Sequence, residues 1–306
     1  MHEIDILLAA YQGEAFIQAQ IISILNQTHS NFHLFVRDDG STDNTVPILR
    51  DLQAKYPEKI TLCSLSDTRN LGVRGNFSEL LCQSHAKYVM FADQDDYWLP
   101  NKIEVTLKKM KELEKFHGEE ALLLVHTDLK VAGPDLSEIS PSFWKYSHID
   151  PEATVLNRLL TQSLVTGCTM MLNRALADLS KPIPAECYMH DWWIALVAGA
   201  FGHIGHVTNA TMLYRQHSTN SIGARKYGLQ RITGLLFSKK NYKKTIAQAK
   251  IFYSRYGSML DPKEKNLVLT FSTLPEQSFI KRKVAFFRCR FFKTGILRNV
   301  YQFLFN

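Results

Sequence analysis

The chain contains the segment Tyr88-Val89-Met90-Phe91-Ala92-Asp93-Gln94-Asp95-Asp96, in which five apolar residues run directly into three acids. Such a run is typical of a buried β-strand, and the ligands of an open α/β sheet bind beyond the carboxyl ends of its strands. Three carboxylates in four residues repel one another and cost stability unless something neutralises them. The segment therefore predicts a hard divalent cation, Mg²⁺ or Mn²⁺, held by oxygens and shared with a phosphorylated substrate. The alternative is that Asp95 or Asp96 caps a helix that begins near Pro100, although a cap requires only one acid.

Around this segment, apolar runs alternate with amphipathic stretches. The predicted strands are 4–9, 33–37, 60–64, 88–92 and 122–127, and the predicted helices are 15–26, 41–55, 76–84 and 102–115. Ser41 is predicted to cap the second of these helices, and the fourth is polar enough to be exposed. This alternation predicts an α/β fold with a mostly parallel, Rossmann-like sheet that helices cover on both faces.

The rest of the chain is less regular. Residues 132–151 are predicted to form a loop. A strand at 169–172, a helix at 192–201 and a strand at 206–214 are expected after it. From residue 222 onward the pattern is helical, basic and rich in aromatic residues.

The formal net charge of +7 is unevenly distributed. Residues 225–306 hold 18 Lys and Arg against 3 Asp and Glu, so the preceding residues carry a net charge of −8. Two electrostatic characters in one chain indicate two parts. We therefore predict a larger α/β domain over residues 1–221 and a basic helical C-terminal region over residues 222–306.

The composition, 45% hydrophobic and 21% charged residues, is ordinary for a soluble globular protein. No run of about 18 apolar residues occurs, so no transmembrane helix is predicted. The N-terminus enters a strand at once, without a basic region and a cleavage site, which argues against secretion. The five cysteines are odd in number and form no C-x-x-C pair, as expected of reduced thiols in a cytoplasmic protein.

Polar residues follow each of the first four predicted strands. They form the loops 10–14, 38–43, 69–72 and 93–96. Because the carboxyl ends of parallel strands meet at one edge of a sheet, the four loops are expected to converge on one crevice. Taken alone, Asp39-Gly40 is equally compatible with a simple turn.

These motifs in this order resemble the family-2 inverting glycosyltransferases, which have the GT-A nucleotide-sugar-binding fold. The resemblance covers roughly residues 3–220. Within the family, the chain resembles in particular the bacterial rhamnosyltransferases of cell-wall or capsular polysaccharide synthesis. The matching segments are Ala10-Tyr11, Glu14, Ile24–Thr28, Asp38–Asp43, Asn70-Leu71-Gly72, Asp93–Asp96 with Trp98-Leu99-Pro100, His190–Trp193 and Tyr214–His217.

The resemblance implies a set of residues that bind the donor, a nucleoside-diphosphate sugar. These are Ala10, Tyr11, Glu14, Asp38, Asp39, Arg69, Asn70, Gly72, Arg74, Asp93 and Gln94. Tyr11 would flank the nucleobase, and Asp39 would accept a hydrogen bond from N3–H of uracil or thymine, which discriminates sharply against other bases. Arg69 or Arg74 would reach the diphosphate. The implied metal ligands are Asp95, Asp93 and His217.

Asp191 is the implied catalytic base, because an inverting transfer needs a carboxylate that takes the proton of the acceptor hydroxyl. Trp192 and Trp193 beside it, and Trp144 in the irregular segment, are expected to line an acceptor groove. Two alternatives remain open for Asp191: it caps a helix, or it forms with His190 the metal pair of a phosphohydrolase.

The last thirty residues interleave cations with aromatic pairs, as in Phe286-Phe287-Arg288-Cys289-Arg290-Phe291-Phe292. The pattern fits an amphipathic helix on an anionic membrane surface, and it predicts a peripheral position at the inner face of the plasma membrane. The alternative is a helix that packs on the catalytic domain with its charges in solvent. No nucleic-acid-binding module accompanies this charge, so nucleic acid is not an expected partner.

The resemblance thus predicts a metal-dependent enzyme that moves rhamnose from dTDP-rhamnose to a glycan or lipid-linked glycan. UDP-linked hexose or N-acetylhexosamine is the alternative donor. A nucleotidyltransferase would show a Gly-rich basic loop after the first strand, whereas Tyr11-Gln12-Gly13-Glu14 is acidic and contains one glycine. A glycan- or membrane-binding module without activity is the other alternative, but it would not need Asp95 and Asp191 together.

Overall fold

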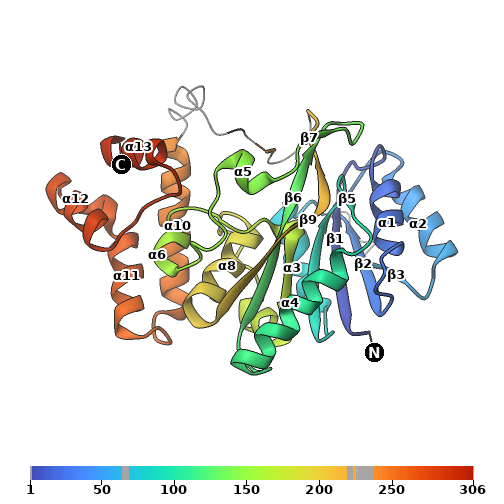
Figure 1. Ribbon diagram of the computed structural model, residues 1–306, viewed down its shortest axis with the longest axis horizontal. Helices are drawn as coiled ribbons and strands as arrows, with labels where there is room; N and C mark the ends of the chain where they lie inside the picture. The colour runs from blue at the N-terminus through green and yellow to red at the C-terminus, as the bar shows by residue number, and fades with distance from the viewer. Residues whose placement is uncertain (1, 64–68, 219–222, 225, 227–237, 306) are drawn as a thin grey trace.

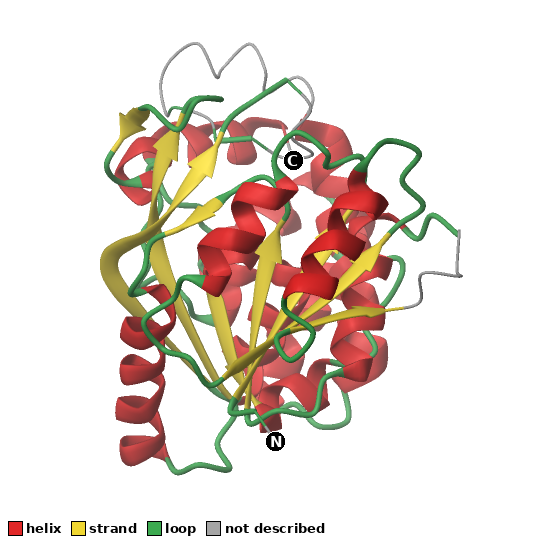
Figure 2. Ribbon diagram, turned by 90° about the vertical axis from the view of Figure 1, so that its right-hand side faces the viewer, coloured by secondary structure: helices red, strands yellow, loops and turns green. Residues whose placement is uncertain are grey.

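The computed structural model describes residues 2–63, 69–218, 223, 224, 226 and 238–305. Its centre is a nine-stranded sheet in which eight strands follow the order β3-β2-β1-β4-β8-β6-β9-β5, and β7 pairs with β6. Helices cover both faces of this sheet, as Figures 1 and 2 show. The predicted α/β fold is confirmed.

The elements alternate through the first half of the chain and become mainly helical at its end. The strands are β1 (Ile4–Ala10), β2 (Phe32–Asp38), β3 (Ile60–Cys63), β4 (Tyr88–Asp93), β5 (Tyr97–Trp98), β6 (Leu123–Ala132), β7 (Glu138–Ser140), β8 (Met170–Asn173) and β9 (His203–Arg215). The α-helices are α1 (Ile17–Leu25), α2 (Thr45–Lys55), α3 (Gly72–Gln83), α4 (Lys102–His117), α5 (Phe143–Ser147), α6 (Leu156–Leu159), α7 (Arg174–Ser180), α8 (His190–Phe201), α10 (Ser238–Tyr256), α11 (Pro262–Ser272), α12 (Phe279–Arg288) and α13 (Ile296–Phe305). The described residues also form the short 3₁₀ helices η1 (Gly167–Thr169) and η3 (Leu274–Glu276). Every predicted strand overlaps an observed one.

The central strands are mostly apolar because each face of the sheet carries its own core. In β1, Ile4, Ile6 and Leu8 belong to one hydrophobic cluster, whereas Leu7 belongs to the other. All four side chains are fully buried. Strands that helices cover on both faces read as continuous apolar runs rather than as alternating patterns.

β8 enters the sheet out of chain order, next to β4. β1 lies between β2 and β4 and is parallel to both. β8, which comes much later in the chain, pairs antiparallel with both β4 and β6. β6 and β9 are parallel, with register shifts after Thr127. The sheet is therefore parallel on the side that carries the four predicted loops and mixed beyond β4.

The C-terminal helices pack at one end of the molecule, on the left in Figure 1, next to α6 and α8. Phe252 and Tyr256 of α10 each lie 5.7 Å, between ring centroids, from Trp193 of α8. The predicted boundary between residues 221 and 222 lies outside the described residues. None of the helices in the described part of the chain has the length and apolar character needed to cross a bilayer.

Three local predictions were wrong. Ser41 does not cap a helix, because α2 begins only at Thr45. Residues 132–151 are not a plain loop, since they contain β7 and α5. The helix after the acidic segment is not exposed all round, because Ile103 and Met110 are fully buried against the sheet.

Candidate active site

The carboxyl ends of β1, β2 and β4 lie level with one another. Ala10 pairs with Asp38 across β1 and β2, and Ala9 pairs with Asp93 across β1 and β4. Hydrogen bonds then join the loops that follow: the main-chain N–H of Gln12 donates to Ser41 Oγ at 2.8 Å, and that of Asp39 donates to the Ala10 carbonyl at 2.8 Å. The predicted loops thus meet at one edge of the sheet.

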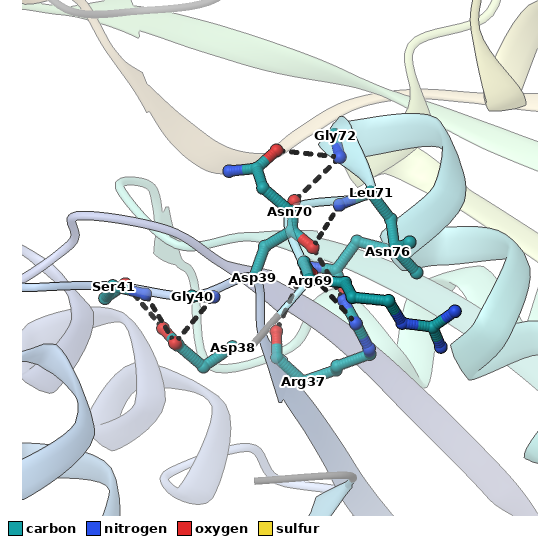
Figure 3. A network of polar contacts seen from close by, with 10 residues as sticks. All are labelled: Arg37, Asp38, Asp39, Gly40, Ser41, Arg69, Asn70, Leu71, Gly72 and Asn76. Atoms are coloured by element: carbon teal, nitrogen blue, oxygen red, sulfur yellow. Dashed lines mark hydrogen bonds and ion pairs between the residues drawn. The ribbon is translucent and has the colours of Figure 1, made fainter. Parts of the chain in front are cut away.

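Asp39 is the centre of a buried polar network that Figure 3 shows. Its Oδ1 accepts from Arg37 at 2.7 Å and from the Leu71 N–H at 2.8 Å, and its Oδ2 accepts from the Gly72 N–H at 2.8 Å. Arg37 also donates to Asn76 Oδ1 at 3.2 Å. A carboxylate oxygen accepts two hydrogen bonds, so Oδ2 can accept one more, which is what a base N3–H requires.

The loop after β2 is held by carboxylates of its own and of its neighbour. Asp38 Oδ2 accepts from the main-chain N–H groups of Gly40 at 3.0 Å and Ser41 at 2.7 Å (Figure 3). Glu14, from the loop after β1, accepts from the main chain and the side chain of Asn44 at 2.9 and 2.8 Å. Both acids are placed to keep the loops in shape.

The remaining predicted donor residues surround this network. The Tyr11 side chain is 48% exposed at the loop surface, and the Gln94 amide bonds to its main chain. Asn70 Oδ1 accepts from the Gly72 N–H at 3.1 Å, and the Arg69 side chain is exposed. The Arg74 guanidinium donates to a main-chain carbonyl, that of Cys187, in the segment before α8.

The acidic segment and the end of β9 bring possible metal ligands together. Asp95 Oδ2 lies 2.8 Å from His217 Nε2, and both side chains are largely buried. Behind them, ligand atoms of Asp93, Asp96 and Cys168 lie within 4.8 Å of one another. Asp96 is fully buried, and its Oδ2 has no hydrogen-bond partner in the described part of the chain. Neither Asp95 nor Asp96 caps a helix, because Asn101 is the residue that precedes α4.

The electrostatics of this cluster favour a bound cation. Burial, followed by the charges of Asp95 and Asp191, raises the pKa of Asp93 to about 7. Burial and the charges of Asp95 and Asp93 also raise the pKa of Asp96 well above its ordinary value. A divalent cation reverses such repulsion. Carboxylate oxygens with one imidazole suit Mn²⁺ or Mg²⁺, so the chemistry of Asp93, Asp95 and His217 fits the predicted metal. Among the described residues, however, the ligand atoms of Asp93 group with those of Asp96 and Cys168, whereas Asp95 pairs with His217.

Asp191 stands in the first turn of α8. Its Oδ1 accepts from the Trp192 N–H at 2.6 Å, and its Oδ2 accepts from the Gly167 N–H at 3.1 Å. Burial outweighs these two hydrogen bonds and raises the pKa of the Asp191 carboxyl to about 6. The carboxylate is near enough to Asp93 for its charge to raise the pKa of Asp93. Asp191 therefore lies at the start of a helix and, at the same time, beside the acidic segment.

His190 does not form a metal pair with Asp191. Its ring packs on Phe77 and Phe91, with centroids 4.1 and 5.4 Å away. Both ring nitrogens are buried without a hydrogen-bond partner among the described residues. Burial lowers the pKa of His190 to about 3, so the ring is a neutral core side chain.

The three predicted acceptor tryptophans are core residues, and the prediction for them was wrong. Trp193 is fully buried and donates from Nε1 to the Ser180 carbonyl at 3.1 Å. Trp192 and Trp144 are only 6% and 7% exposed. Because so little of each residue is exposed, none of the three rings presents an open face on which a sugar could stack.

Arg215 and Cys168 also belong to the site. Arg215 lies in the matching segment Tyr214–His217 but was given no role, and Cys168 was not singled out. Arg215 Nε donates to the Asp95 carbonyl at 2.8 Å, and its guanidinium carbon lies 4.7 Å from the ring centroid of Phe16. The His217 ring lies 4.6 Å from that of Phe16. A basic residue at the end of an apolar strand was the available signal for Arg215. A single cysteine far from the acids gave none for Cys168.

Comparisons with known proteins agree with this geometry. Residues 5–119 match the family model described as Glycosyl transferase family 2. The chain is 27% identical over 229 residues to the dTDP-rhamnosyl transferase RfbG of Shigella flexneri. The alignment covers 71% of this chain and 74% of RfbG. The chain is also similar to the UDP-Glc:alpha-D-GlcNAc-diphosphoundecaprenol beta-1,3-glucosyltransferase WfaP of Escherichia coli, with 29% identity over 161 residues. That alignment covers 52% of this chain and 62% of WfaP. A crystal structure of S. aureus TarS superposes with a TM-score of 0.57 and 19% identity over 93% of this chain and 74% of that chain, a likeness of fold.

Proposed function

This chain is a glycosyltransferase of family 2, and from that premise we propose that it is a metal-dependent, inverting enzyme. The first expected donor is dTDP-rhamnose, and the acceptor is a polysaccharide or a lipid-linked glycan. The observation that carries the proposal is the position of Asp191, whose carboxylate lies beside the acidic segment that ends β4. The similarity to a dTDP-rhamnosyl transferase supports the donor.

Each partner in the reaction has a proposed role. Asp191 takes the proton of the acceptor hydroxyl while the oxygen attacks the anomeric carbon, and the bond from that carbon to the diphosphate breaks on the opposite side. A cation held by Asp95, Asp93 and His217 would offset the charge of the departing nucleoside diphosphate. The in-line displacement inverts the anomeric centre, so β-L-rhamnose would give an α-linked product.

The nucleotide is proposed to lie along the loops after β1, β2 and β3. Tyr11 flanks the base, and the free lone pair of Asp39 Oδ2 accepts its N3–H. Asp38, Glu14 and Gly72 keep the pocket in shape, with support from their hydrogen bonds in the loops. The further donor contacts are assigned to Ala10, Asn70, Arg69, Arg74 and Asp93.

A panel of nucleotide sugars tests this proposal. With Mn²⁺, dTDP-rhamnose at about 100 times its Kd is expected to raise Tm by about 5 °C, since ligand binding at that excess stabilises by about 2.7 kcal/mol. EDTA should remove the shift. Release of dTDP in the presence of a glycan acceptor would establish turnover.

The same panel decides between donors. UDP-glucose and UDP-N-acetylglucosamine are the alternative, which the similarity to a UDP-glucose-dependent relative supports. A shift with UDP-sugars but not with dTDP-rhamnose would replace the rhamnose assignment. If no nucleotide sugar shifted Tm with either cation, the proposed donor site would be wrong.

We also propose that the C-terminal region, divided from the catalytic domain near residue 221, holds the enzyme on the anionic inner face of the plasma membrane. α12 buries Phe286 against the core but leaves Ile280, Val284 and Phe287 between 57% and 75% exposed. The spacing of these three residues places them on one side of the helix. Lys and Arg interleave with them, and each contributes about 1 kcal/mol near an anionic surface.

Vesicle sedimentation tests the membrane contact. The wild type is expected to bind vesicles that contain anionic phospholipid and not vesicles of phosphatidylcholine alone. The double variant Ile280→Glu/Val284→Glu should lose at least tenfold in binding, because it places two charges on the inserting face. Phe116→Glu is the matched control, since Phe116 is 83% exposed on α4. Equal binding by the double variant would remove α12 from the proposal.

A further inference from the structure

The side chain of Gln94 continues the hydrogen bonding between β1 and β4 beyond the ends of the two strands. The two strands pair up to Ala9 and Asp93. Beyond that point the Tyr11 N–H donates to Gln94 Oε1 at 2.8 Å, and Gln94 Nε2 donates to the Tyr11 carbonyl at 2.8 Å. The carboxamide therefore takes the place of a peptide group and extends the pairing into the loops.

The loop after β1 is shaped around this amide. A Cβ atom added to Gly13 would lie 2.4 Å from Gln94 Oε1, which is far inside van der Waals contact. The Gly13 N–H meanwhile donates to Thr45 Oγ1 at 2.7 Å. Gly13 is thus held between Gln94 on one side and α2 on the other, with no room for a side chain.

Two glutamines hold the loop from two directions. The Gln12 amide bonds to the loop after β2: its Nε2 donates to Thr42 Oγ1 at 3.0 Å, and its Oε1 accepts from the Thr42 N–H at 2.9 Å. Gln94 holds the same loop from the acidic segment, where its chain neighbours are Asp93 and Asp95. Only the second connection leads to the proposed cation site.

We propose that Gln94 is a positioning residue that couples cation binding at the acidic segment to the order of the nucleobase-binding loop 11–14. A cation that fixes Asp93 and Asp95 fixes Gln94 between them, and the two hydrogen bonds pass that order to the Tyr11 main chain. The inference rests on the proposed function for the identity of the two subsites. Because coupling is reciprocal, an ordered nucleobase loop must also strengthen cation binding.

Nucleosides test the coupling, because thymidine and uridine carry no phosphate that could touch the cation. In the wild type, saturating Mn²⁺ is expected to strengthen nucleoside binding about fivefold relative to EDTA, measured by calorimetric titration. In Gln94→Ala this ratio should fall to about one. Gln94→Glu keeps the acceptor for the Tyr11 N–H but turns a second oxygen toward the Tyr11 carbonyl, so its ratio should lie between the two.

Gln12→Ala is the matched control. It removes an amide from the same loop, but from the connection that does not lead to the acidic segment. Its nucleoside affinity should fall with and without Mn²⁺, and its ratio should remain near that of the wild type. A wild-type ratio retained in Gln94→Ala would overturn the proposal, and so would a ratio lost equally in both variants.

Hydrogen–deuterium exchange provides a second readout that needs no nucleotide. Once loss of the free Mn²⁺ EPR signal shows that the cation is bound, exchange of the amides of residues 11–14 should slow in the wild type and not in Gln94→Ala. Unchanged wild-type exchange with bound Mn²⁺ would overturn the coupling alone. Failure of the donor proposal would be seen separately, as absence of nucleoside diphosphate release.

Discussion

Asp191→Asn is expected to lower turnover by roughly 10²- to 10⁴-fold, the usual contribution of a positioned general base, while the affinity for the donor stays the same. Asparagine has the size of aspartate but cannot take the proton of the acceptor hydroxyl. Its amide oxygen can still accept from one of the two main-chain N–H groups, those of Gly167 and Trp192. Initial rates at saturating donor, together with donor titrations, would separate the two effects.

The pH dependence of the wild type follows from the same carboxyl group. Burial raises the pKa of Asp191 to about 6, and the base acts only when ionised, so kcat/KM, which reports the free enzyme, should fall about tenfold per pH unit below 6. The raised pKa also means that the ionised form destabilises the fold at pH 7, by about 3 kcal/mol for a shift of two units. Asp191→Asn removes this cost, which offsets its lost hydrogen bond.

The control for this prediction is Asp178→Asn on α7. Asp178 is half exposed and forms surface ion pairs with Arg174 and Lys181, so its substitution should leave activity within twofold. A turnover loss of less than tenfold in Asp191→Asn, or an equal loss in both variants, would exclude Asp191 as the base.

Asp95→Ala is expected to lower kcat/KM by roughly 10³-fold, a loss comparable to removing a main electrostatic stabiliser of a transition state. Asp95 Oδ2 and His217 Nε2 lie 2.8 Å apart, as expected of groups that share one cation. Mn²⁺ titration followed by EPR should show weaker binding in this variant. Its Tm with donor and Mn²⁺ should equal its Tm in EDTA.

A double-mutant cycle sharpens the prediction for the metal. If Asp95 and His217 bind the same cation, the variant with both replaced by alanine should be little worse than the poorer single variant. His203→Ala is the matched control, because His203 is an exposed residue that stacks on His117 at 3.6 Å, between ring centroids, on another part of the molecule. Additive losses in the double variant would show that the two residues act on different steps.

The sequence predicted the parallel half of the sheet well because the evidence there is local. Residues 88–92 form an apolar run and residues 4–9 are apolar except for Asp5, and both end in polar loops. Buried strands with helices on both sides read in this way. The position of β8 could not be predicted in the same way. Its pairing with β4 joins residues far apart in the chain, and no local pattern specifies such a partner.

The same distinction applies to the candidate site. The acids at strand ends could be recognised because carboxylates after an apolar run are unusual and need a partner. The burial of Trp193 could not be recognised, because it depends on α10, which packs on it from another part of the chain. The Arg37–Asp39 ion pair was missed for a related reason, since an arginine in a strand carries no sign of the direction in which it points.

While the chain is being synthesised, one edge of β4 remains uncovered until β8 emerges. The elements between them include α4 and β6, and at 5–20 residues per second the interval lasts roughly 4–15 s. An apolar strand with a free edge is a template for pairing with other chains, so a nascent or truncated chain that stops near residue 119, where the family match ends, should aggregate. β8 follows directly after Gly167–Thr169, so the strand that covers this edge also delivers the Gly167 N–H to Asp191. The strand that protects this edge therefore also prepares the position of Asp191, which follows it in the chain at the start of α8.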